Sequence, residues 1–262
     1  MKAKKLIIVI SIIGIVIGLV LISYSTVAVF LSNISQTYVV RNYDKKISKL
    51  PKAEINIIKN KSRHPGKQSS TVFAQGEIEG YITIPKINVL LPIYEGTKET
   101  VLNKGAGHLS STSLPGGGKN TNCVLTGHSG YTTATLFNDL DLLNKGDFFH
   151  IKFLDEVYTY KVKKILVKEK SIAYKFIGIE RGKDLCTLVT CTPKTINSHR
   201  LIVVGQRDKS KLSYKQLNNY INSKEKKQNF IVLITIVSIL VLIILFFYFY
   251  KRRKKRGDEN DN

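Results

Sequence analysis

The sequence predicts a mainly β fold, a barrel or a sandwich, with one transmembrane helix on either side of it. From residue 77 onward, short runs of β-branched residues alternate with turn residues, which is the pattern of such folds. Long helical patterns do not alternate with these runs, so βαβ units are not expected. Two long uncharged stretches, residues 6–31 and 230–250, bracket the β region.

The composition is that of a folded membrane protein. The 262 residues carry a net charge of +22, and 43% are hydrophobic, which excludes disordered and collagen-like chains. Residues 6–31 exceed the roughly 20 residues that cross a bilayer. They are also too long for the apolar core of a cleavable signal peptide, which has about 7–15 residues. Residues 230–250 end in a cluster of aromatic residues, as a second span should.

The basic residues beside these stretches predict the orientation. Three lysines precede the first stretch and six basic residues, 251–256, follow the second. Because such residues stay on the cytoplasmic side, both termini are expected inside the cell and the domain between them outside. The basic tail could bind nucleic acid, but its place beside a span favours membrane lipid.

The stretch between the spans is long enough for one domain. Residues 33–76 are polar and are expected to leave the membrane as a helix and continue as a loop. Strands are expected over residues 80–84, 89–94, 121–126, 148–153, 157–167, 184–190 and 201–205. A short helix is expected over residues 135–143. The predicted segments are a start and first span (1–31), a linker or lid-like segment (32–76), a catalytic domain (77–210), a linker (211–229), a second span (230–250) and a basic tail (251–262).

A thiol site is the chemistry that the cysteines and histidines favour. The chain has no CxxC or HExxH motif, so no metal site is expected. Cys191 ends one predicted strand, His128 follows another, and Arg200 opens a third. A nucleophilic thiol needs a histidine that moves a proton and a donor for the oxyanion. Isolated cysteines are more often small buried hydrophobes, so spacing alone leaves both readings open.

Several motifs resemble those of sortases, the cysteine transpeptidases of Gram-positive cell surfaces. They are TLVTC at 187–191 with TPKTINSHRLIVVGQR after it, TGHSGY from residue 126, LFNDLDLLNKGD downstream, and GHLSSTSLPGGG from residue 107. The resemblance covers residues 80–207, with the motifs in the family's order. It implies a closed sortase β-barrel with short helices, in which Cys191 is the nucleophile, His128 the acid/base and Arg200 the cation that orients substrate or stabilises the oxyanion. It also implies that the enzyme needs no cofactor.

Within the family the chain is most similar to class C, the pilin-polymerising sortases. The Thr-Cys-Thr-Pro run, the SLPGGG segment and the carboxy-terminal span carry this resemblance. It implies cleavage of an LPXTG-like sorting signal through a thioester, and transfer to an amine, a pilin lysine. One departure is the absence of the Asp-Pro dipeptide of the class C lid. Residues 32–76 are therefore expected to be a shortened or differently anchored lid, or a linker.

Other functions remain open beside pilus assembly. A sortase that anchors surface proteins to cell-wall peptide would use the same residues with a different amine. A cysteine hydrolase would release its product to water. A non-catalytic envelope-binding module would not need Cys191, His128 and Arg200 together.

The remaining histidines and cysteines are given structural roles. His199 is a rival base, but neighbours along a strand face opposite ways, so it cannot share a site with Arg200. His108 is expected in a loop or structural position, His64 in a solvated loop and His150 at the surface. The other two cysteines, Cys123 and Cys186, lie five residues before the predicted site residues, and are expected as buried free thiols or as a disulfide.

Overall fold

The computed structural model describes residues 2–62, 72–194, 196–209 and 214–258. The helices are α1 (Lys2–Lys49), α2 (Lys52–Ser62), α3 (Glu99–Leu102) and α4 (Tyr214–Asp258). The strands are β1 (Ile78–Ile84), β2 (Val89–Glu95), β3 (Ala106–His108), β4 (Thr121–Thr126), β5 (Phe148–Phe153), β6 (Glu156–Glu169), β7 (Asp184–Thr192) and β8 (His199–Asp208). The described residues also include the short 3-10 turns η2 (Pro85–Ile87), η3 (Leu140–Leu142) and η4 (Ala173–Phe176).

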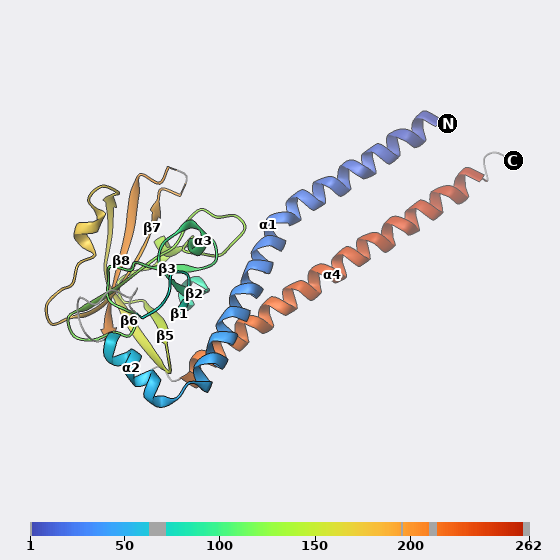
Figure 1. Ribbon diagram of the computed structural model, residues 1–262. Coiled ribbons are helices and arrows are strands. Elements are labelled where there is room, and N and C mark those ends of the chain that lie inside the picture. Colours follow the sequence, from blue (N-terminus) through green and yellow to red (C-terminus); the bar gives the residue numbers. More distant parts are fainter. Residues whose placement is uncertain (1, 63–71, 195, 210–213, 259–262) are drawn as a thin grey trace. The chain divides into compact units, whose positions relative to one another are not determined.

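The strands form a closed barrel in the order β1-β2-β3-β4-β7-β8-β6-β5 (Figure 1). The β2–β3 and β4–β7 pairs are parallel, and the other neighbours are antiparallel. Closure leaves no unpaired sheet edge. The alternative of a sandwich is thereby excluded, and the prediction of a mainly β barrel with short helices is confirmed.

The barrel interior is filled by large aromatic and aliphatic side chains. Phe149 and Tyr160 are fully buried and stack with ring centroids 5.4 Å apart. Gly205 leaves the space that the Phe149 ring occupies, because a Cβ there would lie 2.4 Å from it. A second apolar cluster of Ala173, Leu185, Ile202 and Val204 joins η4 to β7 and β8. Side chains on both faces of these two strands are therefore held in place by packing.

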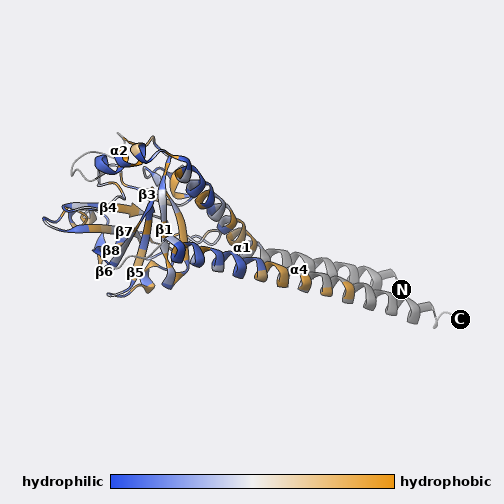
Figure 2. Cartoon of the chain, turned by 90° about the horizontal axis from the view of Figure 1, so that it is seen from below, coloured by the Kyte–Doolittle hydropathy of each residue, from blue (hydrophilic) through white to orange (hydrophobic). Residues whose placement is uncertain are grey.

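The second half of α1 packs on the barrel through Tyr43. Its ring is 3% exposed and meets Tyr81 edge-on, with centroids 6.1 Å apart. Its hydroxyl donates to the carbonyl of Glu79 (2.7 Å) and accepts from the N–H of Leu154 (2.8 Å). Figure 2 shows hydrophilic and hydrophobic residues side by side along this half of α1. Such a surface can pack on the barrel with one part and face water with another.

Helix α2 contacts the barrel where β5 turns into β6. The ammonium of Lys59 lies 2.7 Å from the carboxylate of Glu156, the first residue of β6. Phe73 meets Phe153, the last residue of β5, edge-on at 6.2 Å. Both contacts belong to the segment 32–76, which was predicted as a linker or lid. They lie at the start of β6, whereas the other end of β6, Glu169, pairs with His199 of β8.

Most of the predicted elements are confirmed, with small extensions. The strands over 121–126 and 148–153 have the predicted bounds. Each of the other five predicted strands is longer than expected, by one to five residues. The helix expected after residue 32 continues to Lys49, and α2 follows where a loop was expected. His64 lies outside the described residues.

The helix predicted over residues 135–143 is wrong except for the 3-10 turn η3. Within this segment the backbone bonds link residues three apart, as from the N–H of Leu142 to the carbonyl of Asp139 (3.0 Å), and other groups bond to the loop before it. The N–H of Phe137 donates to the carbonyl of His128 (2.9 Å), and the side-chain amide of Asn138 donates to the carbonyl of Tyr131 (2.7 Å). These bonds fold the segment back on the residues that follow β4.

The chain divides into two units, Met1–Tyr214 and Lys215–Asn262. The second unit is the helical remainder of α4, to Asp258. Within the part of the chain that the structure describes, no helix combines the length and the apolar character of a membrane span. Many side chains of residues 6–31 and 230–250 lie outside the described residues. The two spans stay predictions.

Candidate active site

The register of two parallel strands brings His128 and Cys191 to one end of the barrel. Thr126 of β4 pairs with Val189 of β7, and His128 and Cys191 each follow two residues later. Parallel strands run to the same edge of a sheet, and residues two apart share a face. Both side chains are therefore placed at the same end of neighbouring strands.

Arg200 joins them from the other side of β7. It is the antiparallel partner of Cys191 in the β7–β8 pair. Directly opposite residues of such a pair point to the same face, with Cβ atoms about 4.5–5.5 Å apart. The next pair is Thr192 with His199, so His199 points to the other face. Its Nδ1 contacts the hydroxyl of Ser198 at 2.8 Å.

Hydrogen bonds fix the ends of β4 and β7 against each other. The hydroxyl of Ser129 donates to the carbonyl of Cys191 (2.6 Å), and that of Thr190 donates to the carbonyl of Gly127 (2.7 Å). Gly127 has no room for a side chain, because a Cβ there would lie 2.8 Å from the ring of Phe137. The residues that flank His128 and Cys191 are thus tied together.

The imidazole of His128 is held between a ring and a carboxylate. Tyr131 stacks on it with centroids 4.8 Å apart and an angle of 18° between the planes. Its Nε2 lies 3.2 Å from Oε1 of Glu99, at the start of α3, in a contact without hydrogen-bond geometry that is ionic only when the imidazole is protonated. The side chain of His128 is 21% exposed, whereas its Nε2 is itself buried.

The guanidinium of Arg200 is bonded to the loop before β8. Nη1 donates to the carbonyls of Asn197 (3.1 Å) and His199 (3.0 Å). A guanidinium has five N–H donors, and these two bonds use only Nη1. Among the residues that the structure describes, the loop fixes the direction of the cation without using the donors on Nε and Nη2.

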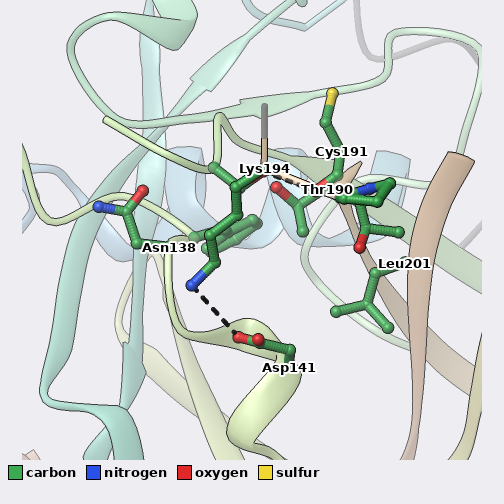
Figure 3. A pocket seen from close by; sticks show the side chains of 10 residues that line it. Asn138, Asp141, Thr190, Cys191, Lys194 and Leu201 are labelled. Carbon is green, nitrogen blue, oxygen red and sulfur yellow. Dashed lines mark hydrogen bonds and ion pairs between the residues drawn. The ribbon is translucent and has the colours of Figure 1, made fainter. Parts of the chain in front are cut away.

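A cavity of 370 Å³ lies beside the end of β7. Its lining includes Cys191, Thr190, Asn138 and Leu201. Figure 3 shows the ammonium of Lys194 directed at Asp141, with the sulfur of Cys191 pointing away from this pair; the two charges are 3.7 Å apart. Cys191 therefore lines the cavity, while its sulfur points away from the Lys194–Asp141 ion pair.

The two other cysteines are direct partners in the β4–β7 register. Cys123 pairs with Cys186, and both are buried free thiols. Burial raises the pKa of the Cys123 thiol well above its ordinary value, and contact with Cys186 raises it further. The structure thus agrees with the free-thiol alternative rather than the disulfide. Cys191 is the half-buried thiol of the three, and a buried neutral thiol is a poor nucleophile.

A buried charged cluster below the site was not predicted. His108 was expected in a loop or structural position; it lies in β3, fully buried, with Nδ1 2.9 Å from Glu79 and 3.5 Å from Glu95. Its Nε2 lies 2.9 Å from the carbonyl of Ser113. The donor atoms lie within 4.8 Å of one another, close enough to hold a metal ion, but the His108–Glu79 ion pair accounts for their approach. His108 lies within the GHLSSTSLPGGG motif, but no motif marks Glu79 or Glu95.

Burial determines the titration of this cluster and of His150. Burial raises the pKa of Glu79 to about 7, although the neighbouring His108 lowers it. Burial alone would lower the pKa of His108, but the carboxylate of Glu79 raises it well above its usual value. His150 was expected at the surface, yet it is half-buried, and burial lowers its pKa to about 4.

Sequence reasoning also missed the neighbours of His128. Tyr131 lies within the TGHSGY motif, so its nearness could have been noticed. Glu99 lies far from His128 in the chain, and no pattern marks it. Its contact depends on the β3–β4 pairing, Gly107 with Thr126, which brings the end of α3 close to the end of β4.

The comparisons with known proteins agree with this geometry. The Sortase domain model matches residues 82–208. Sortase D of Bacillus subtilis is 31% identical over 152 residues, which are 57% of this chain and 73% of that protein. Sortase A of Listeria monocytogenes is 31% identical over 150 residues, 56% of this chain and 64% of that protein.

Solved structures of class C sortases share the fold. That of Streptococcus pneumoniae sortase C, reported with its pilin substrate specificity, has a TM-score of 0.61 and 37% identity, and the match covers 67% of this chain and 99% of that one. That of Clostridium perfringens sortase C with the C-terminal cell wall sorting motif has a TM-score of 0.59 and 37% identity, with 65% and 98% covered. The chain belongs to the sortase family of cysteine transpeptidases, and its structural neighbours are class C sortases.

Proposed function

We propose that this chain is a membrane-anchored sortase that joins a sorting-signal protein to a pilin lysine. The observation that carries the proposal is the convergence of Cys191, His128 and Arg200 at one end of the barrel, through the β4–β7 and β7–β8 registers. The likeness to class C structures, one of which is reported with pilin substrate specificity, supports the choice of acceptor.

The first half of the reaction forms a thioester. The Cys191 thiolate attacks a backbone carbonyl of an LPXTG-like signal, and a C–S bond forms as the carbonyl oxygen becomes an oxyanion. Arg200 stabilises this charge with its remaining N–H donors. The C–N bond then breaks, and protonated His128 gives its proton to the leaving amine.

The second half transfers the acyl group. An incoming amine attacks the thioester, and His128 takes a proton from it as the C–N bond forms. The sulfur of Cys191 then leaves as the thiolate, so no cofactor is consumed. A pilin lysine as acceptor gives a polymer, and a cell-wall peptide amine gives anchoring, which is the alternative.

Membrane attachment belongs to the same proposal. The apolar stretches 6–31 and 230–250 would place both termini in the cytoplasm and residues 32–229 outside the cell. Substrates with their own membrane anchor would then meet the enzyme at a raised effective concentration. Residues 251–256 would rest against anionic lipid.

The acceptor is identified by competition. The full-length chain in detergent micelles is given a sorting-signal peptide together with a pilin domain, a lysine-free variant of that domain, or a wall peptide. The proposal expects an isopeptide product on the pilin domain that its lysine-free variant does not give. Product on the wall peptide alone would favour anchoring, and release to water in every case would identify a hydrolase.

A further inference from the structure

We infer that Asn122 is a positioning residue for the sorting signal, because its side chain holds the β6–β7 loop, residues 170–183, against the sheet face that carries Cys191. The inference rests on the proposed function, since it gives the loop a part in binding the peptide that Cys191 cleaves. Asn122 lies in β4, six residues before His128, and is 2% exposed. None of the motifs that mark the family includes it.

The side-chain amide of Asn122 joins β4 to β7 and to the β6–β7 loop. Its nitrogen donates to the backbone carbonyls of Ile177 (2.9 Å) and Gly178 (3.0 Å) in the loop. Its oxygen accepts the hydroxyl of Thr187 in β7 (2.9 Å). The opposite orientation of the amide would place its oxygen against two carbonyl oxygens, so one orientation alone satisfies all three contacts. Both N–H donors of the amide are therefore used to hold the loop.

The backbone of Asn122 is fixed independently of the loop. Its N–H donates to the hydroxyl of Ser113 (3.1 Å), and its carbonyl accepts the N–H of Ser113 (3.2 Å). On its other side it pairs with Leu185 of β7. Thr187, whose hydroxyl orients the amide, is fully buried. A buried polar network with its hydrogen bonds made is rigid, so the amide reaches the loop from a fixed position.

The middle of the β6–β7 loop is also attached by apolar packing. Ala173 of η4 belongs to the apolar cluster on β7 and β8, and Ile177 packs against that cluster. Apolar packing is non-directional, whereas hydrogen bonds to backbone carbonyls fix the course of the chain. Gly178 is exposed, so water can replace the amide at its carbonyl. Loss of the amide should therefore release this part of the loop and leave the barrel folded.

The loop borders the sheet face on which the reaction takes place. Thr187 and Cys191 are four residues apart in β7, so their side chains point to the same face, about 13 Å apart along the strand. The loop begins near the site, since the residue before it, Glu169, pairs with His199 of β8. Its contact with Asn122 lies at the level of Thr187. The loop thus accompanies this face over the whole distance.

A sorting signal is long enough to reach from the thiol to the held part of the loop. Four extended residues span about 13 Å, so an LPXTG-like peptide laid along β7 from Cys191 reaches Ile177 and Gly178. If the loop is released, it must be ordered again whenever the peptide binds, which lowers the apparent affinity. The three reactive side chains do not belong to the loop. Loss of Asn122 should therefore weaken peptide binding without slowing the step at the sulfur.

The test compares three variants of the network with Ser113→Ala as matched control. Asn122→Ala removes the amide. Thr187→Val removes the hydroxyl that orients the amide and keeps the shape of the side chain, whereas Thr187→Ser keeps the hydroxyl. Ser113→Ala takes a buried hydrogen bond from the same Asn122 but leaves its bonds to the loop in place. The full-length chain in detergent micelles is used throughout.

Three quantities are measured for each variant. The rate of acyl-enzyme formation, followed by intact mass against the concentration of an LPXTG-type peptide, gives a half-saturating concentration and a maximal rate. The rate of Cys191 alkylation by iodoacetamide reports on the thiol without substrate. Hydrogen exchange of the peptides that cover residues 170–183 reports on the loop.

Asn122→Ala is expected to raise the half-saturating concentration about fivefold or more, the effect of two lost hydrogen bonds. Its maximal rate should stay within about twofold of the wild type, as for a loss of binding alone. Thr187→Val should show a smaller rise, and Thr187→Ser should restore the wild-type value. Exchange in the loop should accelerate in the same order, while alkylation of Cys191 stays unchanged. Ser113→Ala should lower the Tm and leave the half-saturating concentration as in the wild type.

Two results would overturn the inference. One is a maximal rate that falls in Asn122→Ala at an unchanged half-saturating concentration, which would place its effect on the chemistry. The other is an equal rise in Ser113→Ala, which would make the residue merely structural. If Asn122→Ala does not fold, Thr187→Val and its rescue by Thr187→Ser decide.

The proposed function and the inference fail in different ways. If the wild type forms no acyl-enzyme with any peptide, the proposed function fails, and hydrogen exchange then decides whether Asn122 holds the loop. Faster exchange over residues 170–183 in Asn122→Ala and Thr187→Val, but not in Ser113→Ala, would support the hold on the loop. Unchanged exchange in both variants would refute it.

Discussion

Replacing Tyr43 by Phe should destabilise the barrel, because one hydroxyl satisfies two buried backbone groups. The register of β1 shifts between Ile78 and Gly80, so the carbonyl of Glu79 turns out of the ladder, and the Tyr43 hydroxyl donates to it. The same oxygen accepts the N–H of Leu154 in the turn between β5 and β6. Phenylalanine keeps the ring packing and leaves both groups without their partner.

Each unsatisfied buried group costs about 1–3 kcal/mol, so the loss of both partners should cost about 2–6 kcal/mol. For a domain of this size, that corresponds to a fall in Tm of roughly 4–24 °C. Tyr38→Phe is the control, since this tyrosine lies on the same helix and is 66% exposed; it should change stability by less than about 0.5 kcal/mol.

The assay combines a global and a local readout on the full-length chain in detergent micelles. Urea and thermal unfolding followed by near-ultraviolet circular dichroism give the loss of stability. Hydrogen exchange of the peptide that contains Leu154 should accelerate in Tyr43→Phe and not in Tyr38→Phe. If the two variants unfold alike, the packing of α1 on the barrel does not contribute as described, and the reasoning is refuted.

Three further outcomes are expected. Because Glu79 and His108 both have raised pKa values in the folded state, these two groups bind more protons in the folded chain than in the unfolded one, whereas His150, whose pKa burial lowers from 6.5 to about 4, binds fewer below its ordinary pKa. Urea midpoints should therefore fall as the pH rises from about 6.5 to 8, and the fall should be smaller in Glu79→Gln. Iodoacetamide should modify Cys191 alone in the native chain and all three cysteines after unfolding without reductant, by mass; a single modified thiol after unfolding would indicate a disulfide. His199→Ala should keep most of the acylation rate while His128→Ala loses about 100-fold or more, and equal losses would contradict the assignment of the base.

Most of the strands could be predicted because each has its own local sequence pattern, a run of β-branched residues between turn residues. The runs over 121–126 and 148–153 are bounded by turn residues, and their predicted and observed bounds agree. β3 could not be predicted, because it has three residues, two of them alanine and glycine, and its existence depends on pairing with β2 and β4. The segment 135–143 instead bonds to the loop that follows β4, from Phe137 to His128 and from Asn138 to Tyr131, and these pairings have no sequence pattern that marks them.

The residues of the candidate site also fall into two groups: those that a sequence pattern marks, and those whose contacts depend on strand pairing. Cys191, His128 and Arg200 follow from motif and from strand alternation, which also separates His199 from them. Glu99 could not be predicted, because it lies far from His128 in the chain and no motif marks it; its contact depends on the pairing of β3 with β4. Cys123 and Cys186 were placed at equal depth by counting back from the site, and the register confirms this pairing.

The identity of the acylated atom tests the central proposal most directly. The full-length chain is incubated with an LPXTG-type peptide, quenched in acid, digested and sequenced by mass spectrometry, with and without hydroxylamine. The account predicts a hydroxylamine-sensitive acyl group on the peptide that contains Cys191, greatly reduced in His128→Ala and in Arg200→Ala, and absent from Cys191→Ala. An acyl group on another residue, or product formed by Cys191→Ala at the wild-type rate, would contradict it.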